Sequence, residues 1–134
     1  SDLVSQAVAL AEAVRYLQAV GMPRIAAHEA ELGERLVTGL SAIDGVRVLG
    51  GEIDLPRVGL ASFDVAGIHS HDVGQFLDDA GIAVRVGHHC AQPLHRRLGV
   101  TASTRASTYL YTTSDEVDAV IDGVARTIDF FRRA

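Results

Sequence analysis

The order of hydrophobic patterns along the chain constrains its fold more than any other feature. Residues 3–20 carry apolar side chains at helical spacing and end at Gly21, and Pro23 then suits the first turn of a second helix through Leu40. Segments with strand-like patterns follow, with further helical segments between them. An order of helices first and interleaved strands afterwards predicts an α+β fold, with a short sheet and helices packed on one face.

Four segments are expected to be strands: residues 46–50, which lead into a turn at residues 50–52, and residues 57–65, 82–86 and 104–111. The last of these alternates strictly. One face would carry Arg105 and Ser107 followed by Tyr109 and Tyr111, and the other face would carry Ala106, Thr108 and Leu110.

Three more helices are expected. Ser70 is a candidate N-cap, and the residues predicted to face inward from its helix are Val73, Phe76, Leu77 and Ala80. Pro93 opens a short helical turn that ends near Leu98. Thr113 and Glu116 have the spacing of a capping box for the last helix, whose apolar stripe is Val117, Val120, Ile121, Val124 and Ile128.

Composition places residues 1–134 in one globular domain, with 48% hydrophobic and 22% charged residues and neither linker nor repeat. The net charge of −5 and the absence of a basic cluster predict no nucleic-acid partner. No segment suggests a membrane span or a signal peptide. One cysteine cannot form an internal disulfide, which favours a reducing, cytoplasmic location.

The chain contains no lysine, because all 12 of its basic residues are arginine. A GC-rich genome would explain this bias. Its chemical consequence is that this chain cannot by itself form a lysine Schiff base with a carbonyl cofactor.

The segment GHHCAQP holds the only cysteine, Cys90, directly after His88 and His89. Adjacent side chains seldom converge on one tetrahedral ion, since structural zinc ligands are usually spaced by two to four residues. His69 and His71 could add a pair, but an expected helix start at Ser70 breaks the extended geometry that would align them. We therefore predict no metal site.

Two readings of Cys90 stay open on the residues alone. A cysteine becomes nucleophilic near positive charge or a helix N-terminus, and Cys90 lies between Arg85 and the helical turn at Pro93. A lone cysteine is otherwise commonly a small buried hydrophobe. Arg105 and Arg85 also allow two interpretations, a solvated sheet face or a site for an anion such as a substrate carboxylate.

The motif RVGHHCAQP, followed by TRASTYLYTTSDEVDAVIDGV, closely resembles the C-terminal part of the group II, SufS-type cysteine desulfurases of the class V aminotransferase-like family. The shared pattern is R-x-G-H-H-C-A-x-P, then R-A-S, then a Tyr-(Asn/Thr)-Thr turn and a helix. The matching residues are Arg85, Gly87, His88, His89, Cys90, Ala91, Pro93, Arg105, Ala106 and Ser107. SHDVGQFLDDAGIAVR and AVALAEAVRYLQAVGMPRI also resemble family segments, so the similarity covers nearly the whole chain.

The resemblance implies the C-terminal small domain of a fold-type I enzyme that depends on pyridoxal 5'-phosphate (PLP) and acts as a homodimer. Such enzymes convert L-cysteine to L-alanine and leave the sulfur as a persulfide for a sulfur-acceptor protein of iron–sulfur cluster assembly. By position, Cys90 would be the nucleophile, Arg105 would bind the substrate carboxylate and Arg85 would line the same pocket. His88 and His89 would have a supporting role.

The family's PLP-binding large domain, with its Schiff-base lysine, has no counterpart in these residues. We therefore expect no covalent PLP, no desulfurase turnover by this chain alone, and an apolar patch left by missing interdomain contacts. Three alternatives remain: a selenocysteine lyase or cysteine-sulfinate relative, a stand-alone persulfide carrier that needs no lysine, and an interaction domain with an inert cysteine.

Overall fold

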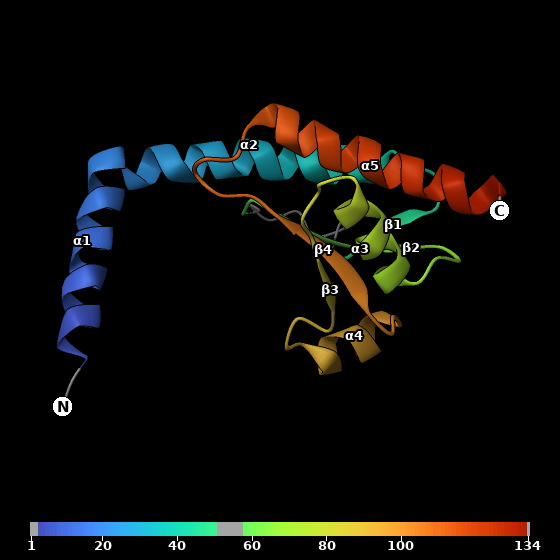
Figure 1. Cartoon of the computed structure of the whole chain (residues 1–134), viewed down its shortest axis with the longest axis horizontal. Coiled ribbons are helices and arrows are strands. Elements are labelled where there is room, and N and C mark those ends of the chain that lie inside the picture. The colour runs from blue at the N-terminus through green and yellow to red at the C-terminus, as the bar shows by residue number, and fades with distance from the viewer. Residues whose placement is uncertain (1–2, 51–57, 134) are drawn as a thin grey trace.

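The structure is a computed structural model that describes residues 3–50 and 58–133. In these residues the elements follow the order α1 (Val4–Val20), α2 (Met22–Ser41), β1 (Val46–Val48), β2 (Leu60–Val65), α3 (Ser70–Asp79), β3 (Arg85–Gly87), α4 (Gln92–Leu98), β4 (Ser103–Ser107) and α5 (Ser114–Arg133). Figure 1 shows α2 and α5 side by side along the sheet, with α4 at the opposite end of the molecule from them.

The strands of the described residues form one sheet in the order β1-β2-β4-β3, and every neighbouring pair is antiparallel. β4 is therefore a central strand, paired with β2 on one side and β3 on the other. The α+β fold predicted from the order of the hydrophobic patterns is confirmed.

The hydrophobic core lies on one face of the sheet. Ala61, Phe63 and Val65 alternate along β2 and are all buried, so Ser62 and Asp64 point to the other face. The buried face packs against α2, α3 and α5, whose buried apolar residues include Leu32, Leu36, Leu40, Val73, Leu77, Val117, Val124 and Ile128. Helices therefore cover one face, as predicted. Polar side chains, including Ser62 and Asp64, lie on the other face, the open face.

The last helix begins as its sequence predicts. Glu116 accepts a hydrogen bond from the backbone N–H of Thr113 at 2.8 Å, and the Thr113 hydroxyl accepts one from the N–H of Glu116 at 3.3 Å. This reciprocal pair satisfies two donors that would otherwise lack partners at the start of α5.

All four predicted strands are shorter in the structure. β1 ends at Val48 rather than at residue 50. β2 begins at Leu60, and Arg57, like the rest of residues 51–57 and most of the turn predicted at 50–52, lies outside the described residues. β3 begins only at Arg85, because Ile82 and Val84 pack on the core without ladder partners. β4 ends at Ser107, because residues 109–112 turn away from the sheet.

Two details of α3 correct the prediction. The N-cap is His69, whose Nδ1 accepts a hydrogen bond from the N–H of His71, so Ser70 is the first helical residue. Val73 and Leu77 are fully buried, whereas Ala80 caps the C-terminal end and is exposed. The helical spacing predicted the buried face but not the residue at which the helix ends.

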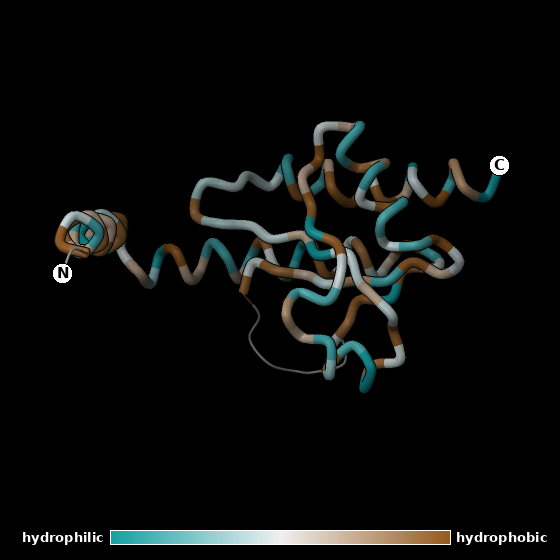
Figure 2. The backbone as a smooth tube through the Cα atoms, turned by 60° about the horizontal axis from the view of Figure 1, so that its bottom comes forward, coloured by the Kyte–Doolittle hydropathy of each residue, from teal (hydrophilic) through white to brown (hydrophobic). Residues whose placement is uncertain are grey.

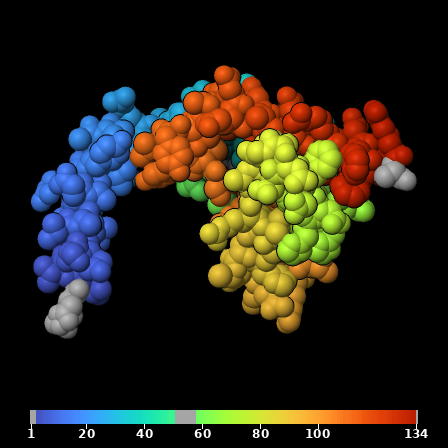
Figure 3. Space-filling view, in the orientation of Figure 1, coloured from blue at the N-terminus to red at the C-terminus, as the bar shows by residue number. Residues whose placement is uncertain are grey.

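α1 stands apart from the rest of the fold (Figures 1 and 3). It has no buried residue, although it carries several hydrophobic ones (Figure 2). Its large exposed hydrophobic side chains are Val4, Val8, Leu10, Val14 and Tyr16. The helix predicted for residues 3–20 is confirmed. These side chains are exposed around the helix rather than gathered on one face, so the expected apolar patch stays a prediction. In the described residues, no helix is both long and apolar enough to cross a membrane.

Candidate active site

Arg105 and Arg85 are neighbours on the open face of the sheet. Arg105 lies in β4, where its Cα pairs with that of Ser62 in β2 and with that of Arg85 in β3. Directly opposed residues of an antiparallel pair point to the same face with Cβ atoms about 5 Å apart. The antiparallel register therefore brings together two arginines that are 20 positions apart in the sequence.

The charges of these two arginines are not balanced by the part of the chain that the structure describes. Arg105 is half-buried, and its Nε atom is buried without a hydrogen-bond partner. The ion pairs of the described residues involve other arginines, namely Arg15, Arg35 and Arg132. Because like charges directly opposite each other repel and a buried N–H needs an acceptor, the pair has the chemistry of an anion site. A guanidinium fits a carboxylate with two parallel hydrogen bonds.

Cys90 lies in a tight turn that follows β3. The N–H of Ala91 donates to the carbonyl of His88 at 2.8 Å, and both central residues have left-handed backbones, with φ of 51° at His89 and 60° at Cys90. Non-glycine residues seldom adopt this conformation, so the turn is held by its surroundings. The thiol-bearing residue is exposed.

His89 connects this turn to the arginines. Its Nε2 donates to the carbonyl of Ser103 in β4 at 3.2 Å. Burial lowers the pKa of His89 most, and the positive charge of Arg105 lowers it further, with smaller contributions from His95 and Arg85, whereas the hydrogen bond to Ser103 opposes the change. The neutral imidazole is therefore favoured, and the cysteine turn lies within the electrostatic reach of both arginines.

His88 is the more exposed of the two motif histidines. Its ring lies edge-on to that of His95, with centroids 5.6 Å apart. The structure thus brings four predicted site residues, Arg85, Arg105, His89 and Cys90, to one region beside the open face, with His88 at its edge.

His95 and Ser103 were missed by the sequence analysis. His95 in α4 is buried, its Nδ1 donates to the carbonyl of Ala91 at 3.0 Å, and its Nε2 lies 2.9 Å from the hydroxyl of the fully buried Ser103. One signal could have indicated the first contact. His95 follows Ala91 by four positions, which in a helix directs its side chain back toward the preceding turn.

The other histidine pair, His69 and His71, lies at the start of α3 with nearly parallel rings 5.5 Å apart. Among residues 3–50 and 58–133, no three His, Cys, Asp or Glu side chains are grouped as they would be to hold a metal ion.

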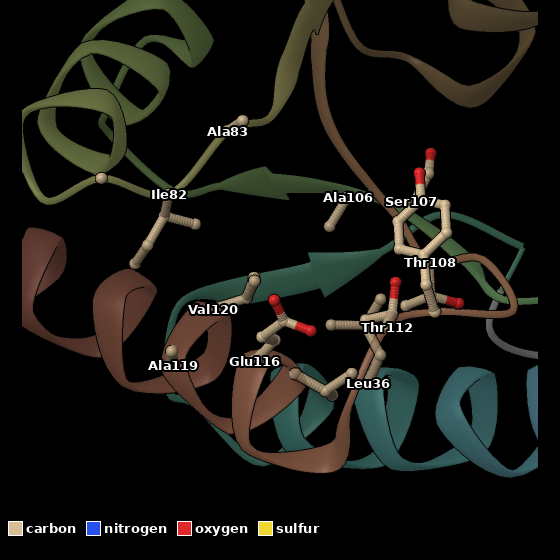
Figure 4. A pocket seen from close by; sticks show the side chains of 13 residues that line it. Leu36, Ile82, Ala83, Ala106, Ser107, Thr108, Thr112, Glu116, Ala119 and Val120 are labelled. Carbon is tan, nitrogen blue, oxygen red and sulfur yellow. The ribbon is translucent and has the colours of Figure 1, made fainter.

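A separate cavity lies away from these residues. It has a volume of about 370 Å³ and lies between α2, the start of α5 and the end of β4, with Leu36, Ala106, Glu116 and Val120 among its walls (Figure 4). None of the predicted site residues lines it. Glu116 is committed to the cap of α5, so the cavity offers apolar walls rather than reactive groups.

Comparison with known proteins identifies the family. The aminotransferase class-V family matches residues 1–120. A probable cysteine desulfurase 2 of Mycobacterium leprae is 55% identical over 133 residues, which are 99% of this chain and 32% of the relative. A probable cysteine desulfurase of Halobacterium salinarum is 50% identical, over 98% of this chain and 31% of the relative.

Solved structures agree with the sequence relatives. An apo cysteine desulfurase from Thermococcus onnurineus superimposes with a TM-score of 0.81 at 35% identity, over 87% of this chain and 29% of that one. A cysteine desulfurase from Escherichia coli containing an S-sulfonic acid gives a TM-score of 0.65 at 35% identity, over 76% of this chain and 26% of that one. The fold therefore matches part of fold-type I PLP enzymes, and the chain spans about a third of the length of its curated relatives. From its matched sequence, its fold and its relatives, this chain belongs to the class V aminotransferase family.

Proposed function

We propose that residues 1–134 form a single C-terminal small domain of a group II cysteine desulfurase, in which Cys90 takes the sulfur of L-cysteine as a persulfide. The observation that carries the proposal is that Arg85 and Arg105 face each other beside the turn of Cys90, without an ion-pair partner among the residues that the structure describes. The relatives named as cysteine desulfurases support the same reaction.

In this proposal Arg105 binds the carboxylate of L-cysteine. Its orphan Nε and its fork of donors suit an acceptor with two oxygens, and the positive charge of Arg85 strengthens the same site. A carboxylate held in this way fixes one end of a small substrate. The sulfur of L-cysteine then lies in a defined direction from Arg105. Cys90 is the nucleophile that accepts this sulfur.

His89 supports this arrangement through its preference for the neutral form. A neutral ring adds no third positive charge beside the arginines, and its Nε2–H keeps the turn bound to β4. His88 lies at the edge of the same region and has a weaker supporting role.

The cofactor of the family is PLP, but the residues of this chain do not supply its covalent attachment. The chain has no lysine, so the Schiff base must come from residues outside these 134. This chain supplies the two arginines that bind the carboxylate, Arg105 and Arg85, and the thiol of Cys90 that accepts the sulfur. We expect the 134-residue chain alone to release no alanine from L-cysteine.

We further propose that the complete enzyme is a cytoplasmic homodimer that passes its persulfide to a sulfur-acceptor protein of iron–sulfur assembly. The single cysteine supports a reducing location, and the relatives named as cysteine desulfurases support the transfer of sulfur. A selenocysteine lyase would use the same carboxylate-binding arginines and the same thiol. Rates of the full-length protein on L-cysteine, L-selenocysteine and L-cysteine sulfinate distinguish the two activities.

The test uses the full-length protein with ³⁵S-labelled L-cysteine and reductant-free quenching. We expect one labelled sulfur on the peptide that contains Cys90, together with stoichiometric L-alanine, and neither in Cys90→Ser. Label on Cys90 that arrives only from a donor protein, without alanine, would instead identify a persulfide carrier. Slow alkylation of Cys90 with no label from either source would identify an inert cysteine.

A further inference from the structure

The buried histidine of α4 makes two hydrogen bonds whose directions can be assigned. The carbonyl of Ala91 only accepts, so Nδ1 of His95 carries the proton of that 3.0 Å bond. In the neutral ring, Nε2 is then the acceptor, and the hydroxyl of Ser103 donates to it over 2.9 Å. Both ring nitrogens are therefore paired in a side chain that is only 4% exposed.

These two bonds join the turn that contains Cys90 to β4, the strand that contains Arg105. Ala91 directly follows Cys90, and Ser103 precedes Arg105 by two positions on the same face of β4. The backbone of Ser103 also pairs with that of Gly87 in β3, from which the chain enters the turn. The turn is thus fastened to β4 at its entrance and at its exit.

Ser103 holds the turn through two different atoms. Its carbonyl accepts from the ring of His89, which precedes Cys90, and its hydroxyl donates to the ring of His95, which is bonded to the residue after Cys90. The ring centroids of His89 and His95 are 5.8 Å apart. Cys90 therefore lies between two anchors that meet on one residue of β4.

The turn needs such anchors because of its backbone. His89 and Cys90 both have positive φ without being glycine, a conformation that steric contacts disfavour. A chain released from its contacts would return to negative φ and carry the thiol with it. Contacts that hold the strained turn therefore set the direction of the thiol.

We propose that His95 is a positioning residue for Cys90, which uses Ser103 to hold the thiol in a fixed place relative to Arg105. Its effect on turnover rests on the proposed function, whereas its effect on the turn does not. A sulfur-accepting thiol must lie within attack distance of a substrate that the clamp holds elsewhere, and misplacement by about 1 Å can cost about 100-fold in rate. Binding of the carboxylate by Arg105 would be unaffected.

Three variants of the full-length protein test this proposal. His95→Leu keeps an apolar side chain in the buried position and removes both ring bonds. Ser103→Ala removes only the hydroxyl. His95→Asn restores a donor near the position of Nδ1 and is the conservative rescue. Thr127→Val is the matched control, because Thr127 is a fully buried residue whose hydroxyl bonds to Gly123 within α5.

The first readout is independent of activity. The N–H of Ala91 closes the turn on His88, so its hydrogen exchange, measured by mass spectrometry of fragments that isolate it, reports whether the turn is held. We expect exchange at least tenfold faster in His95→Leu and Ser103→Ala, intermediate exchange in His95→Asn, and the wild-type rate in Thr127→Val.

The second readout separates positioning from binding. We expect kcat for alanine release to fall 10- to 100-fold in His95→Leu while KM for L-cysteine changes less than twofold, with partial recovery in His95→Asn. Unchanged exchange at Ala91 in both His95→Leu and Ser103→Ala would overturn the proposal. Faster exchange with an unchanged kcat would overturn it equally. A wild-type protein that releases no alanine would refute the proposed function instead, and exchange at Ala91 would then decide whether His95 holds the turn.

Discussion

Arg85 and Arg105 face each other across β3 and β4, and neither forms an ion pair within the described residues. An arrangement of this kind is unfavourable for the protein alone and favourable once an anion lies between the two guanidiniums. Binding and stability should therefore respond in opposite directions when either charge is removed.

Arg105→Gln in the full-length protein should weaken substrate binding. Loss of a bidentate contact with a carboxylate is worth about 3 kcal/mol, so kcat/KM for L-cysteine should fall about 100-fold, chiefly through a higher KM. Steady-state alanine release measures this. Arg35→Gln is the control, because Arg35 makes a bidentate pair with Asp118 between α2 and α5 and should leave kcat/KM unchanged. Equal losses in both variants would contradict a carboxylate clamp.

Arg85→Gln should stabilise the ligand-free 134-residue chain. Removal of one of two opposed like charges in an antiparallel pair should raise the free energy of unfolding by roughly 0.5 kcal/mol. Urea unfolding at low ionic strength measures the difference, and added salt should reduce it by screening. Arg96→Gln, on the exposed surface of α4, serves as the control. A loss of stability in Arg85→Gln would show that the charge already has a partner.

His89 should make stability depend on pH. Its pKa in the folded protein is lowered from 6.5, so the unfolded chain binds a proton more readily. Stability should therefore fall as the pH drops from about 6.5 toward the lowered pKa of the folded state, and His89→Gln should remove this part of the fall. Urea unfolding between pH 7.5 and 5 tests the slope. Because Arg105 lowers the pKa of His89, an NMR titration of Arg105→Gln should show it raised; an unchanged value would contradict that cause.

Leucine substitutions should distinguish α1 from the core. In the 134-residue chain, Leu36→Ala should cost about 2–5 kcal/mol of unfolding free energy, because Leu36 is 1% exposed and its loss leaves a cavity. Leu10→Ala should change stability by less than about 0.5 kcal/mol, since Leu10 is 67% exposed. Urea unfolding of both variants provides the comparison, and a large cost at Leu10 would mean that α1 packs against the domain.

Gly33→Ala should destabilise the chain although alanine is the better helix former by about 1 kcal/mol. A Cβ at this position of α2 would lie 2.7 Å from the backbone carbonyl oxygen of Val58, which cannot move as a side chain does. The helix and the segment before β2 would have to separate, at a net cost of about 1–3 kcal/mol in thermal unfolding. Ala26→Gly, at an exposed position of the same helix, measures helix propensity alone. If Gly33→Ala were more stable than the wild type, the backbone at Val58 would have moved away to make room for the added Cβ.

The helices and their buried faces could be predicted from the sequence because period and capping are local properties. Thr113 and Glu116 make the predicted bonds, and the spacing of Val117, Val124 and Ile128 matches their burial. The ends of strands could not be predicted in this way. Alternation continues past Ser107, but a strand also needs a partner, and the chain turns at residues 109–112 instead.

The residues of the candidate site could be predicted from the sequence. The contacts that position them could not. Resemblance pointed to Cys90, Arg105 and Arg85, whereas the pairing of the two arginines depends on the register of three strands. The spacing of His95 from Ala91 could indicate their contact, but its burial could not be predicted, because a polar residue in a short helix is usually exposed. Only its tertiary contact with Ser103 shows that it is buried and fully bonded.

The central position of β4 has a consequence for how such a chain can evolve. Side chains along the strand alternate between the core and the open face, with Thr104 and Ala106 inward and Arg105 outward. One residue inserted ahead of Arg105 would reverse this alternation, turning its guanidinium toward Phe63 and bringing Ala106 to the surface. An insertion or deletion within Ser103–Ser107 should therefore abolish the site, whereas a change of length in the turns outside this strand leaves its alternation intact.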